Sequence, residues 1–413
     1  MEVKPKRVKY ACYSVNVAMA AVSCLSPVLF ITFHQQYGIS YSLLGLLVLV
    51  NFVTQLGIDL IFSFFSHKFP IERAVKLTPI LTFIGLLIYA LAPVLFPSAV
   101  YVGLLLGTVI FSVSGGFCEV LISPVIAALP SDNPEHEMSK LHSVFAWGSV
   151  FIVVFSTLFL LAFGRENWQW LAGVYVLIPL VSVFLFSGTA LPKMETPERV
   201  SGVLAYFKKG WLWLSVLAIF FGGAAECTMS QWASGYLEQA LGIPKIWGDI
   251  CGVALFSVMM GIGRSLYAKR GRHIERVLLL GAIGATLCYL TAALCPIPVI
   301  GLVACALTGL CVSMLWPGSL ILAADKFPTG GVFIYAMMAA GGDLGASVGP
   351  QLVGLVTDTA IGNATLVSLA AEWAMTPEQL AMKLAMLVGA LFPLLAIGIY
   401  TVFLRKSKKQ TSL

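Results

Sequence analysis

Charged residues are scarce in this sequence. Only 11% of its 413 residues are Asp, Glu, Lys or Arg, while 59% are hydrophobic and the mean hydropathy is +0.93. A soluble globular domain carries about 25% charged residues, so this composition excludes a large water-soluble domain. A transmembrane helix needs about 20 mostly apolar residues, and the chain is long enough for about twelve of them. We therefore expect an all-α polytopic membrane protein.

Residues that build metal centres and catalytic sites are also few. The chain has five histidines and nine cysteines, and the cysteines do not show the spacing of metal ligands. The H-E-x-x-H pattern of zinc proteases does not occur. We therefore expect no metal, no cofactor and no enzymatic activity. The cysteines are expected to pack as small apolar side chains.

Twelve apolar stretches predict transmembrane helices, because an open segment in lipid satisfies its own backbone hydrogen bonds only as a helix. The predicted spans cover residues 10–33, 41–65, 74–95, 99–123, 141–163, 168–188, 211–237, 246–268, 275–294, 297–322, 331–356 and 380–404.

Basic residues are concentrated on one side of the predicted membrane. If the N-terminus is cytoplasmic, 22 of the 25 lysines and arginines face the cytoplasm, and only Arg165, Lys245 and Lys383 lie on the other side. The positive-inside rule therefore predicts that both termini are cytoplasmic. We expect the protein in the plasma (inner) membrane. The basic pI of ≈ 8.8 follows from this topology and does not indicate nucleic-acid binding.

The chain divides into two similar halves. The longest polar interruption, at residues 189–210, leaves six predicted spans on each side. Residues 36–40 (Gln-Tyr-Gly-Ile-Ser), before the second span, resemble residues 240–244 (Ala-Leu-Gly-Ile-Pro), before the eighth. Repeated six-helix halves with a site near the membrane midplane are typical of secondary transporters. We expect an N-terminal bundle at 1–188, a cytoplasmic loop at 189–210 and a C-terminal bundle at 211–413.

Two loops resemble a pattern of the major facilitator superfamily. Residues 268–272 read Ala-Lys-Arg-Gly-Arg, which is similar to the D-R-x-G-R loop of that family with its acidic residue lost. The matching loop between the second and third spans reads His-Lys-Phe-Pro at 67–70. The resemblance implies two pseudo-symmetric bundles of six helices. It also implies that basic residues of these loops take part in gating, namely Lys68, Lys269 and Arg272.

Three shorter stretches resemble the fucose–proton symporter family within that superfamily. Residues 119–124 read Glu-Val-Leu-Ile-Ser-Pro, which is similar to E-x-x-x-N-P with Ser in place of Asn. The fifth span opens with Leu-His at 141–142, and the seventh carries Glu226, Trp232 and Tyr236 at a family-like spacing. This resemblance implies proton-coupled sugar uptake. Some members have an acidic residue in the first span, and this chain has none there.

Carboxyl groups inside the predicted spans are the strongest candidates for function, because a charge at the helix centre costs about 2.5–3.5 kcal/mol or more. Glu119, Glu226 and Asp343 are such residues, and the middle of the spans offers no Lys or Arg as a partner. A carboxyl group in apolar surroundings can bind and release a proton near neutral pH. We expect these three to couple transport to protons. A structural role for each is the alternative.

Asp59, towards the cytoplasmic end of the second span, and Arg264, near the cytoplasmic end of the eighth, are expected at the gate. Asp59 also shares one helix face with Asn51 and Gln55, which lie eight and four residues before it, respectively. These amides are expected either to line a cavity or to bond to a neighbouring helix.

Deep aromatic and polar residues complete the expected solute site. A Trp ring can stack on the apolar face of a sugar, although packing in the core is the alternative for each. The expected solute-binding residues are Asn51, Gln55, Trp147, Gln231, Trp232, Tyr236 and Trp316.

The sequence therefore predicts a transporter that works by alternating access, with proton-coupled uptake of a sugar or another small polar solute. Its expected partners are that solute, protons and the lipid bilayer, and we expect a monomer. Two alternatives stay open. One is proton-antiport efflux of amphipathic compounds, and the other is a membrane sensor on the same scaffold that does not transport.

Overall fold

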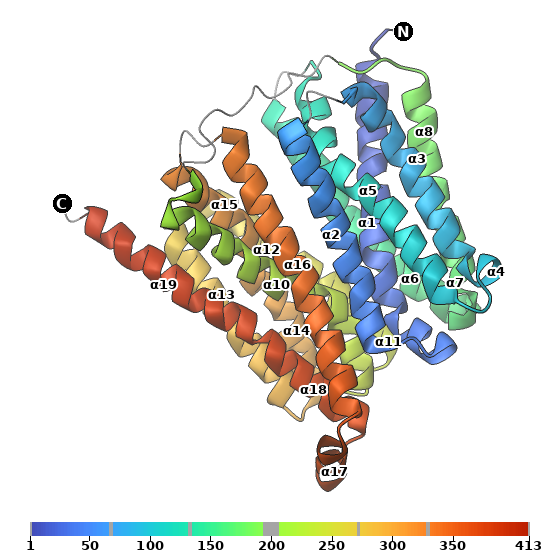
Figure 1. The fold of residues 1–413 in the computed structure, drawn as a ribbon, viewed down its shortest axis with the longest axis vertical. Helices are drawn as coiled ribbons and strands as arrows, with labels where there is room; N and C mark the ends of the chain where they lie inside the picture. The colour runs from blue at the N-terminus through green and yellow to red at the C-terminus, as the bar shows by residue number, and fades with distance from the viewer. Residues whose placement is uncertain are drawn as a thin grey trace. The chain divides into compact units, whose positions relative to one another are not determined.

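The computed structural model describes residues 2–65, 69–130, 134–192, 206–270, 273–327 and 331–411, and these are almost entirely helical (Figure 1). The chain forms two compact units. The first unit contains Met1–Gly38 and Val50–Arg199, and the second contains Ile39–Leu49 and Val200–Leu413. The boundary at Arg199 falls within the polar interruption at 189–210. The first turns of the second predicted span belong to the second unit.

In the first unit, the predicted spans correspond to single helices or to pairs of helices. Proline explains one break, because Pro93 starts the short helix that ends the third span. The elements are α1 (Pro5–Tyr37), α2 (Tyr41–Phe65), α3 (Ile71–Ala90), α4 (Ala92–Leu95), α5 (Val100–Ala127), α6 (Pro134–Phe163), η2 (Arg165–Asn167), α7 (Trp168–Tyr175) and α8 (Leu177–Ser187).

The second unit has the same kind of elements and one π-helix, η3, at the start of the eighth span. The elements are α10 (Gly210–Gln239), α11 (Lys245–Trp247), η3 (Gly248–Ala254), α12 (Leu255–Arg270), α13 (Ile274–Leu294), α14 (Pro298–Val312), α15 (Leu315–Lys326), α16 (Gly331–Ile361), α17 (Ala364–Glu372), α18 (Pro377–Gly389) and α19 (Leu391–Thr411).

Within the described residues, ten helical segments are long and apolar enough to cross a membrane. The pair Met337–Ile361 and Ala364–Glu372, bent by 82°, would be an eleventh. The remaining predicted span corresponds to α3, whose first turns carry Glu72, Arg73 and Lys76. The helix α17 was not predicted. It begins because the Asn363 side chain accepts hydrogen bonds from the backbone N–H groups of Thr365 and Leu366.

Glycines allow the helices of each unit to pack closely. In the first unit, a Cβ added at Gly85 of α3 would lie 2.6 Å from the backbone N of Phe111 on α5. In the second unit, a Cβ added at Gly223 of α10 would lie 2.7 Å from the carbonyl oxygen of Gly342 on α16. Membrane helices associate through such small residues, because lipid provides no hydrophobic force between them.

Candidate functional site

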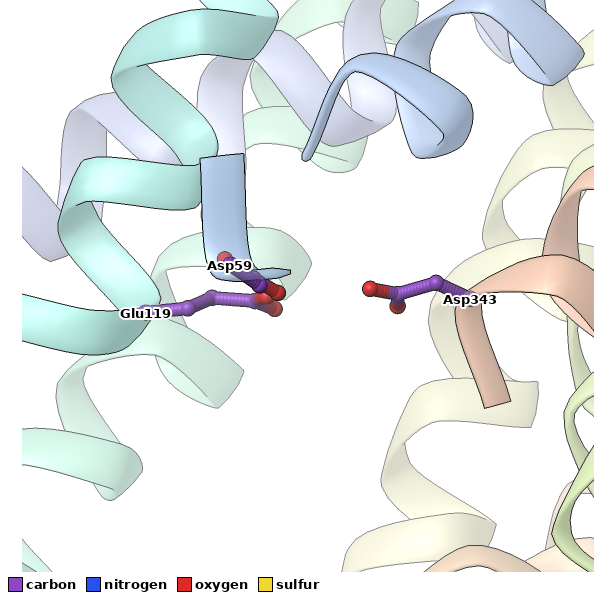
Figure 2. A group of neighbouring side chains, drawn as sticks. All are labelled: Asp59, Glu119 and Asp343. Carbon is purple, nitrogen blue, oxygen red and sulfur yellow. The ribbon is translucent and has the colours of Figure 1, made fainter. Parts of the chain in front are cut away.

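Two carboxyl groups meet between α2 and α5 in the first unit. Asp59 on α2 is 6% exposed, whereas Glu119 on α5 is exposed. An oxygen of Asp59 lies within 4.8 Å of an oxygen of Glu119. Figure 2 shows these two carboxyl groups side by side, and it also labels Asp343 of α16. Two carboxyl groups this close can share one proton or bind a cation.

Glycines on α5 place Glu119 beside Asp59. A Cβ added at Gly115 would lie 2.9 Å from Cδ of Gln55, and one at Gly116 would lie 2.6 Å from Cβ of Ile58. The two helices therefore cross with little space between their backbones. Glu119 lies one turn after these glycines, and Asp59 directly follows Ile58, so both acids lie at the crossing.

The two amides of α2 form a hydrogen-bonded network with α5. Gln55 donates through Nε2 to Oδ1 of Asn51 at 2.9 Å, and Ser112 donates through Oγ to the same atom at 2.6 Å. Gln55 is 6% exposed, while Asn51 is half-buried. Interhelical bonding, one of the two expected roles, therefore holds for Asn51. Asn51 and Gln55 precede Asp59 on α2 at intervals of four residues, so the network lies on the same helix as one member of the acid pair.

Asn16 of α1 also bonds towards this region, although sequence analysis did not select it. Its Nδ2 donates to the carbonyl oxygen of Leu141 at 2.9 Å, and its Oδ1 accepts from Sγ of Cys118 at 3.3 Å. Cys118 precedes Glu119 on α5. Asn16 thus connects α1, α5 and α6 beside the acid pair. A buried Asn in an otherwise apolar first span was the available signal, because such an amide requires partners.

A cavity of about 460 Å³ lies between α1 and α6 of the first unit. Trp147 is 71% exposed and lines it together with Phe151, so the expected solute-binding tryptophan faces open space. Carbon atoms make up most of the surface of this cavity. The full lining is Tyr13, Val17, Lys140, Ser143, Val144, Trp147, Gly148 and Phe151.

An ion pair joins the starts of α1 and α6 near this cavity. Lys9 Nζ lies 2.6 Å from Oε2 of Glu137, and Tyr13 donates through its hydroxyl to the same oxygen at 3.1 Å. The bond from Lys9 lowers the pKa of Glu137 below its usual value, and the bond from Tyr13 acts in the same direction. The carboxylate form of Glu137 is therefore favoured.

Glu226 has a basic partner, which the sequence did not predict. Arg264 of α12 extends its side chain to α10, where Nη2 lies 3.4 Å from Oε1 of Glu226. Its Nε donates to the carbonyl oxygen of Ser313 at 3.1 Å. The prediction that Glu226 lacks a basic residue within reach was therefore wrong. The Arg264 side chain is long enough to reach Glu226 from the part of α12 near the predicted cytoplasmic end of the span.

The other expected solute residues of the second unit differ in exposure. Trp232 and Tyr236 are each 1% exposed. Trp232 donates through Nε1 to the Pro350 carbonyl at 2.9 Å, and Tyr236 donates to the Ala292 carbonyl. These bonds satisfy their polar atoms and favour packing roles for both. Gln231, which directly precedes Trp232 on α10, is half-buried.

Trp316 of α15 is half-buried and packs against glycines of two helices. A Cβ added at Gly223 of α10 would lie 2.8 Å from its ring, and one at Gly342 of α16 would lie 2.5 Å from it. The ring therefore fills the space that these two glycines leave. Its contacts favour the packing alternative.

Asp343 lies in the same glycine-rich part of α16 and is 3% exposed. Ser347 donates to its backbone carbonyl at 2.6 Å. The stretch 345–349 reads Gly-Ala-Ser-Val-Gly and thus matches the pattern of a serine nucleophile elbow. That elbow requires a sharp turn between a strand and a helix, whereas this stretch lies inside α16. Ser347 is fully buried, so the match has no catalytic geometry.

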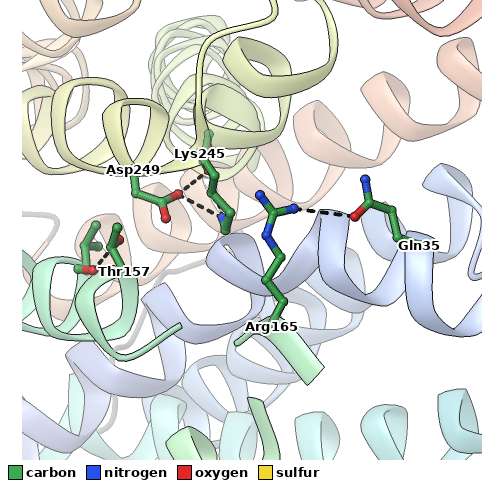
Figure 3. Close-up of polar contacts among 7 residues, drawn as sticks. Gln35, Thr157, Arg165, Lys245 and Asp249 are labelled. Atoms are coloured by element: carbon green, nitrogen blue, oxygen red, sulfur yellow. Dashed lines mark hydrogen bonds and ion pairs between the residues drawn. The ribbon is translucent and has the colours of Figure 1, made fainter. Parts of the chain in front are cut away.

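A buried ion pair lies where α11 and η3 pack against α10, and sequence analysis did not predict it. Lys245 and Asp249 are 9% and 0% exposed, and Lys245 Nζ lies 3.0 Å from Oδ1 of Asp249. Ser234 of α10 donates to the same oxygen. Figure 3 shows the pair, and it also shows Arg165 donating to Gln35 at 3.4 Å in the first unit. The i, i+4 spacing of Lys245 and Asp249 at the start of a span was the available signal.

The expected gating residues are only partly placed. Asp59 and Arg264 form the contacts given above. Lys269 is exposed in the last turn of α12. Lys68 and Arg272 lie outside the described residues.

The two helical units and their intramembrane carboxyl groups define a polytopic α-helical membrane protein of the transporter type. The sequence pattern of the Major Facilitator Superfamily matches residues 11–350. The chain belongs to this superfamily, whose fold consists of twelve transmembrane helices in two six-helix bundles. A search of curated protein sequences found no match.

Solved structures of the superfamily share the fold along nearly the whole chain. A bacterial homologue of the human lysosomal transporter Spinster, in an inward-facing and occupied conformation, is 14% identical over 97% of both chains, with a TM-score of 0.74. A D-xylose–proton symporter is 16% identical over 94% of this chain and 96% of its own, with a TM-score of 0.68. The Escherichia coli fucose–proton symporter is 18% identical over 94% and 98%, with a TM-score of 0.56. At these identities the likeness shows the fold alone.

Proposed function

We propose that this protein is a secondary active transporter that couples the uptake of a sugar or another small polar solute to protons by alternating access. The observation that carries the proposal is the Asp59–Glu119 pair on α2 and α5. Superfamily membership supports transport, and similar structures include a D-xylose–proton symporter and a fucose–proton symporter.

The acid pair supplies a proton site with two states. When one proton is shared, the two carboxyl groups attract each other through a hydrogen bond. When both are ionised, they repel each other across less than 4.8 Å. A proton that binds in one conformation and leaves in another therefore shifts the population between them. In this proposal Glu119 carries the proton, Asp59 shares it, and Glu226 and Asp343 are secondary candidates.

Solute binding is assigned to groups that face open space or can exchange their hydrogen bonds. In the first unit these are Asn51, Gln55 and Trp147. In the second unit this is Gln231 of α10, a half-buried amide that can both donate and accept. Partner exchange within such networks lets hydroxyl groups of a solute replace internal hydrogen bonds at little net cost.

The proposed setting is the plasma (inner) membrane, with a monomer whose two termini are cytoplasmic. The bias of basic residues supports this orientation. Lys68, Lys269 and Arg272 would then lie at the cytoplasmic gate together with Asp59 and Arg264.

A second candidate function is the efflux of amphipathic compounds in exchange for protons. The cavity between α1 and α6 favours it, because Val17, Val144, Trp147 and Phe151 give it a largely apolar wall. The lysine at its edge, Lys140, would suit a solute with an anionic group.

A ligand screen followed by a flux assay tests both candidates. Ligands that bind the folded protein raise its melting temperature by mass action, so the purified protein is screened against sugars, amino acids, nucleosides and amphipathic anions and cations. Hits are then tested in proteoliposomes with an inward proton gradient. Accumulation of a sugar or similar solute, abolished by a protonophore, supports uptake. Accumulation of a solute without sodium that survives the protonophore would exclude proton symport.

A further inference from the structure

The first turns of α2 are bound to the end of α16 by one carboxylate. The backbone N–H of Tyr41 donates to Oδ1 of Asp358 at 3.1 Å, and that of Ser42 donates to Oδ2 at 2.7 Å. These are the first two amides of α2, and amides in the first turn have no partner within their own helix. A carboxylate that accepts both bonds also interacts with the positive end of the helix dipole. Asp358 therefore caps the N-terminus of α2, although it lies 316 positions after Ser42 in the sequence.

The packing below this cap is close. Ser42 donates through Oγ to the carbonyl oxygen of Gly354 at 3.5 Å. A Cβ added at Gly45 of α2 would lie 3.0 Å from Cα of Gln351 on α16. A Cβ added at Gly354 would overlap the carbonyl oxygen of Tyr41. Residues 41–45 and 351–358 thus form one continuous contact, which we call the α2–α16 contact.

This contact explains why α2 is divided. Ile39–Leu49 belong to the second unit, while the helix from Val50 onward belongs to the first. The part from Val50 onward carries Asp59, which pairs with Glu119 on α5. The start of α2 is therefore held by Asp358 within the second unit.

We propose that Asp358 is a gating residue that keeps this end of the transport path closed. The inference rests on the alternating-access function proposed above. Opening at the membrane face where α1 ends and α2 begins requires residues 41–45 to leave α16. Two charge-assisted hydrogen bonds from Asp358 oppose that step, and under the proposed topology this is the outer face. Asp358 does not need to contact the solute for this role.

The test compares Asp358→Ala and Asp358→Asn with wild type in the full-length protein in nanodiscs. Amide hydrogen exchange of residues 41–45 is one readout. The other is labelling of a Gln351→Cys reporter by a membrane-impermeant maleimide, in a background without the native cysteines. Thr359→Ala is the matched control, because Thr359 is exposed and its Oγ1 bonds only within α16, to Leu355 at 2.7 Å.

For Asp358→Ala we expect both rates to rise by about five- to tenfold, the change in population that loss of a helix cap produces. Asp358→Asn should give a smaller rise, because one acceptor oxygen remains. Thr359→Ala, and the amides of helix α13 in every variant, should stay at wild-type rates. If Asp358→Ala does not fold, Asp358→Asn decides in its place. Wild-type rates in the folded variant, or a rise of equal size throughout α13, would overturn the proposal.

These readouts need neither a solute nor a proton gradient. Failure of the gating proposal is therefore distinct from failure of proton-coupled uptake. If Asp358→Ala speeds labelling but the protein accumulates no solute, the gate is retained and the transport proposal is lost.

Discussion

At the residue scale, Glu119 is the group that we propose as the proton carrier. It can donate to Asp59 when it carries a proton and cannot do so when it is ionised. Pro124, five residues later on α5, has no N–H to donate, and this leaves the carbonyl of Val120 without its usual helical partner. In the proposal, a protonated Glu119 therefore bonds to Asp59, and an ionised Glu119 is repelled by it.

We predict that Glu119→Gln separates binding from proton coupling. Gln has nearly the shape of a protonated Glu, so the variant should still bind the solute and exchange it across the membrane. It should not accumulate the solute above the level that wild type reaches with a protonophore. Glu119→Ala should also lose binding if the carboxyl group contacts the solute. Ligand binding and gradient-driven uptake are measured on the same preparations.

Glu72→Gln is the control for this prediction, because Glu72 is an exposed acid that pairs with Lys76 at 2.8 Å within α3. It should accumulate solute like wild type. Equal accumulation by Glu119→Gln would make Glu119 structural, and Glu226 would be the next residue to test.

Sequence analysis selected the carboxyl groups inside the spans but did not predict which residues lie next to them. Glu119, Glu226 and Asp343 stand out because a charge inside a membrane is costly wherever it lies. Asp59 and Glu119 are 60 positions apart, so their pairing depends on how α2 crosses α5. The reach of Arg264 to Glu226 depends on a side-chain conformation. No periodicity in the sequence encodes either contact.

At the scale of elements, two buried lysines connect segments of the second unit. The π-helix η3 is joined to α10 through Asp249, Lys245 and Ser234. Lys383 of α18 is 9% exposed and donates to the carbonyl oxygen of Ala293 at the end of α13. Two of the three basic residues that the topology assigns to the outer side are thus buried within the second unit.

We predict that Asp249→Asn destabilises the protein by about 3–5 kcal/mol, because it leaves the buried Lys245 charge without its partner. The double variant Lys245→Gln and Asp249→Asn should recover part of that loss. Thermal unfolding of the purified protein measures both effects. Lys76→Gln is the control, because its ion pair with Glu72 at 2.8 Å is exposed and should contribute less than about 1 kcal/mol. An Asp249→Asn melting temperature equal to that of Lys76→Gln would contradict this account.

We predict that the connection between α1 and α6 weakens in acid. The pKa of Glu137 in the folded protein is lowered by its bond to Lys9, so the unfolded chain binds a proton more readily than the folded protein. The stabilisation is therefore complete above the ordinary carboxyl pKa, which is 4.5. It is lost as the pH falls through the lowered value. Glu137→Gln should lower the melting temperature at pH 7 and remove this part of the acid dependence. A variant that loses stability in acid as steeply as wild type would contradict the assignment.

Most element boundaries were predictable, because a helix that crosses the lipid needs a long apolar run and other kinds of segment rarely have one. The breaks inside spans were less predictable. The third, sixth, tenth and twelfth spans each consist of two helices, since bends depend on packing against neighbours. The helix α17 was missed because its nine residues are too short for a span and its start depends on a local cap at Asn363.

At the scale of the whole molecule, we predict that the loop at 189–210 faces the cytoplasm. A single cysteine at Ser201, in a background without native cysteines, should resist an impermeant maleimide applied to intact cells. A cysteine at Ser368 of α17 should react, because the topology places α17 outside. Reversed labelling of the two positions would invert the orientation.

The fold and the superfamily could be predicted from the sequence, whereas the division of α2 could not. Composition and the twelve apolar runs already specify a polytopic helical protein, and the superfamily match at residues 11–350 agrees with the loop patterns. The first turns of α2 belong to the second unit through backbone amides of Tyr41 and Ser42. Backbone donors are present at every residue except proline, so their use at one helix start leaves no trace in the sequence.

The most direct test of proton-coupled uptake is proton movement driven by the solute itself. Proteoliposomes that contain a pH-sensitive dye, with no imposed gradient, receive a solute selected by the thermal-shift screen. The account predicts that the interior becomes more acidic on addition of solute with the wild-type protein, and that Glu119→Gln gives no acidification. Solute entry without any pH change in the wild-type protein would contradict proton symport, and alkalinisation of the interior would indicate exchange of solute for protons.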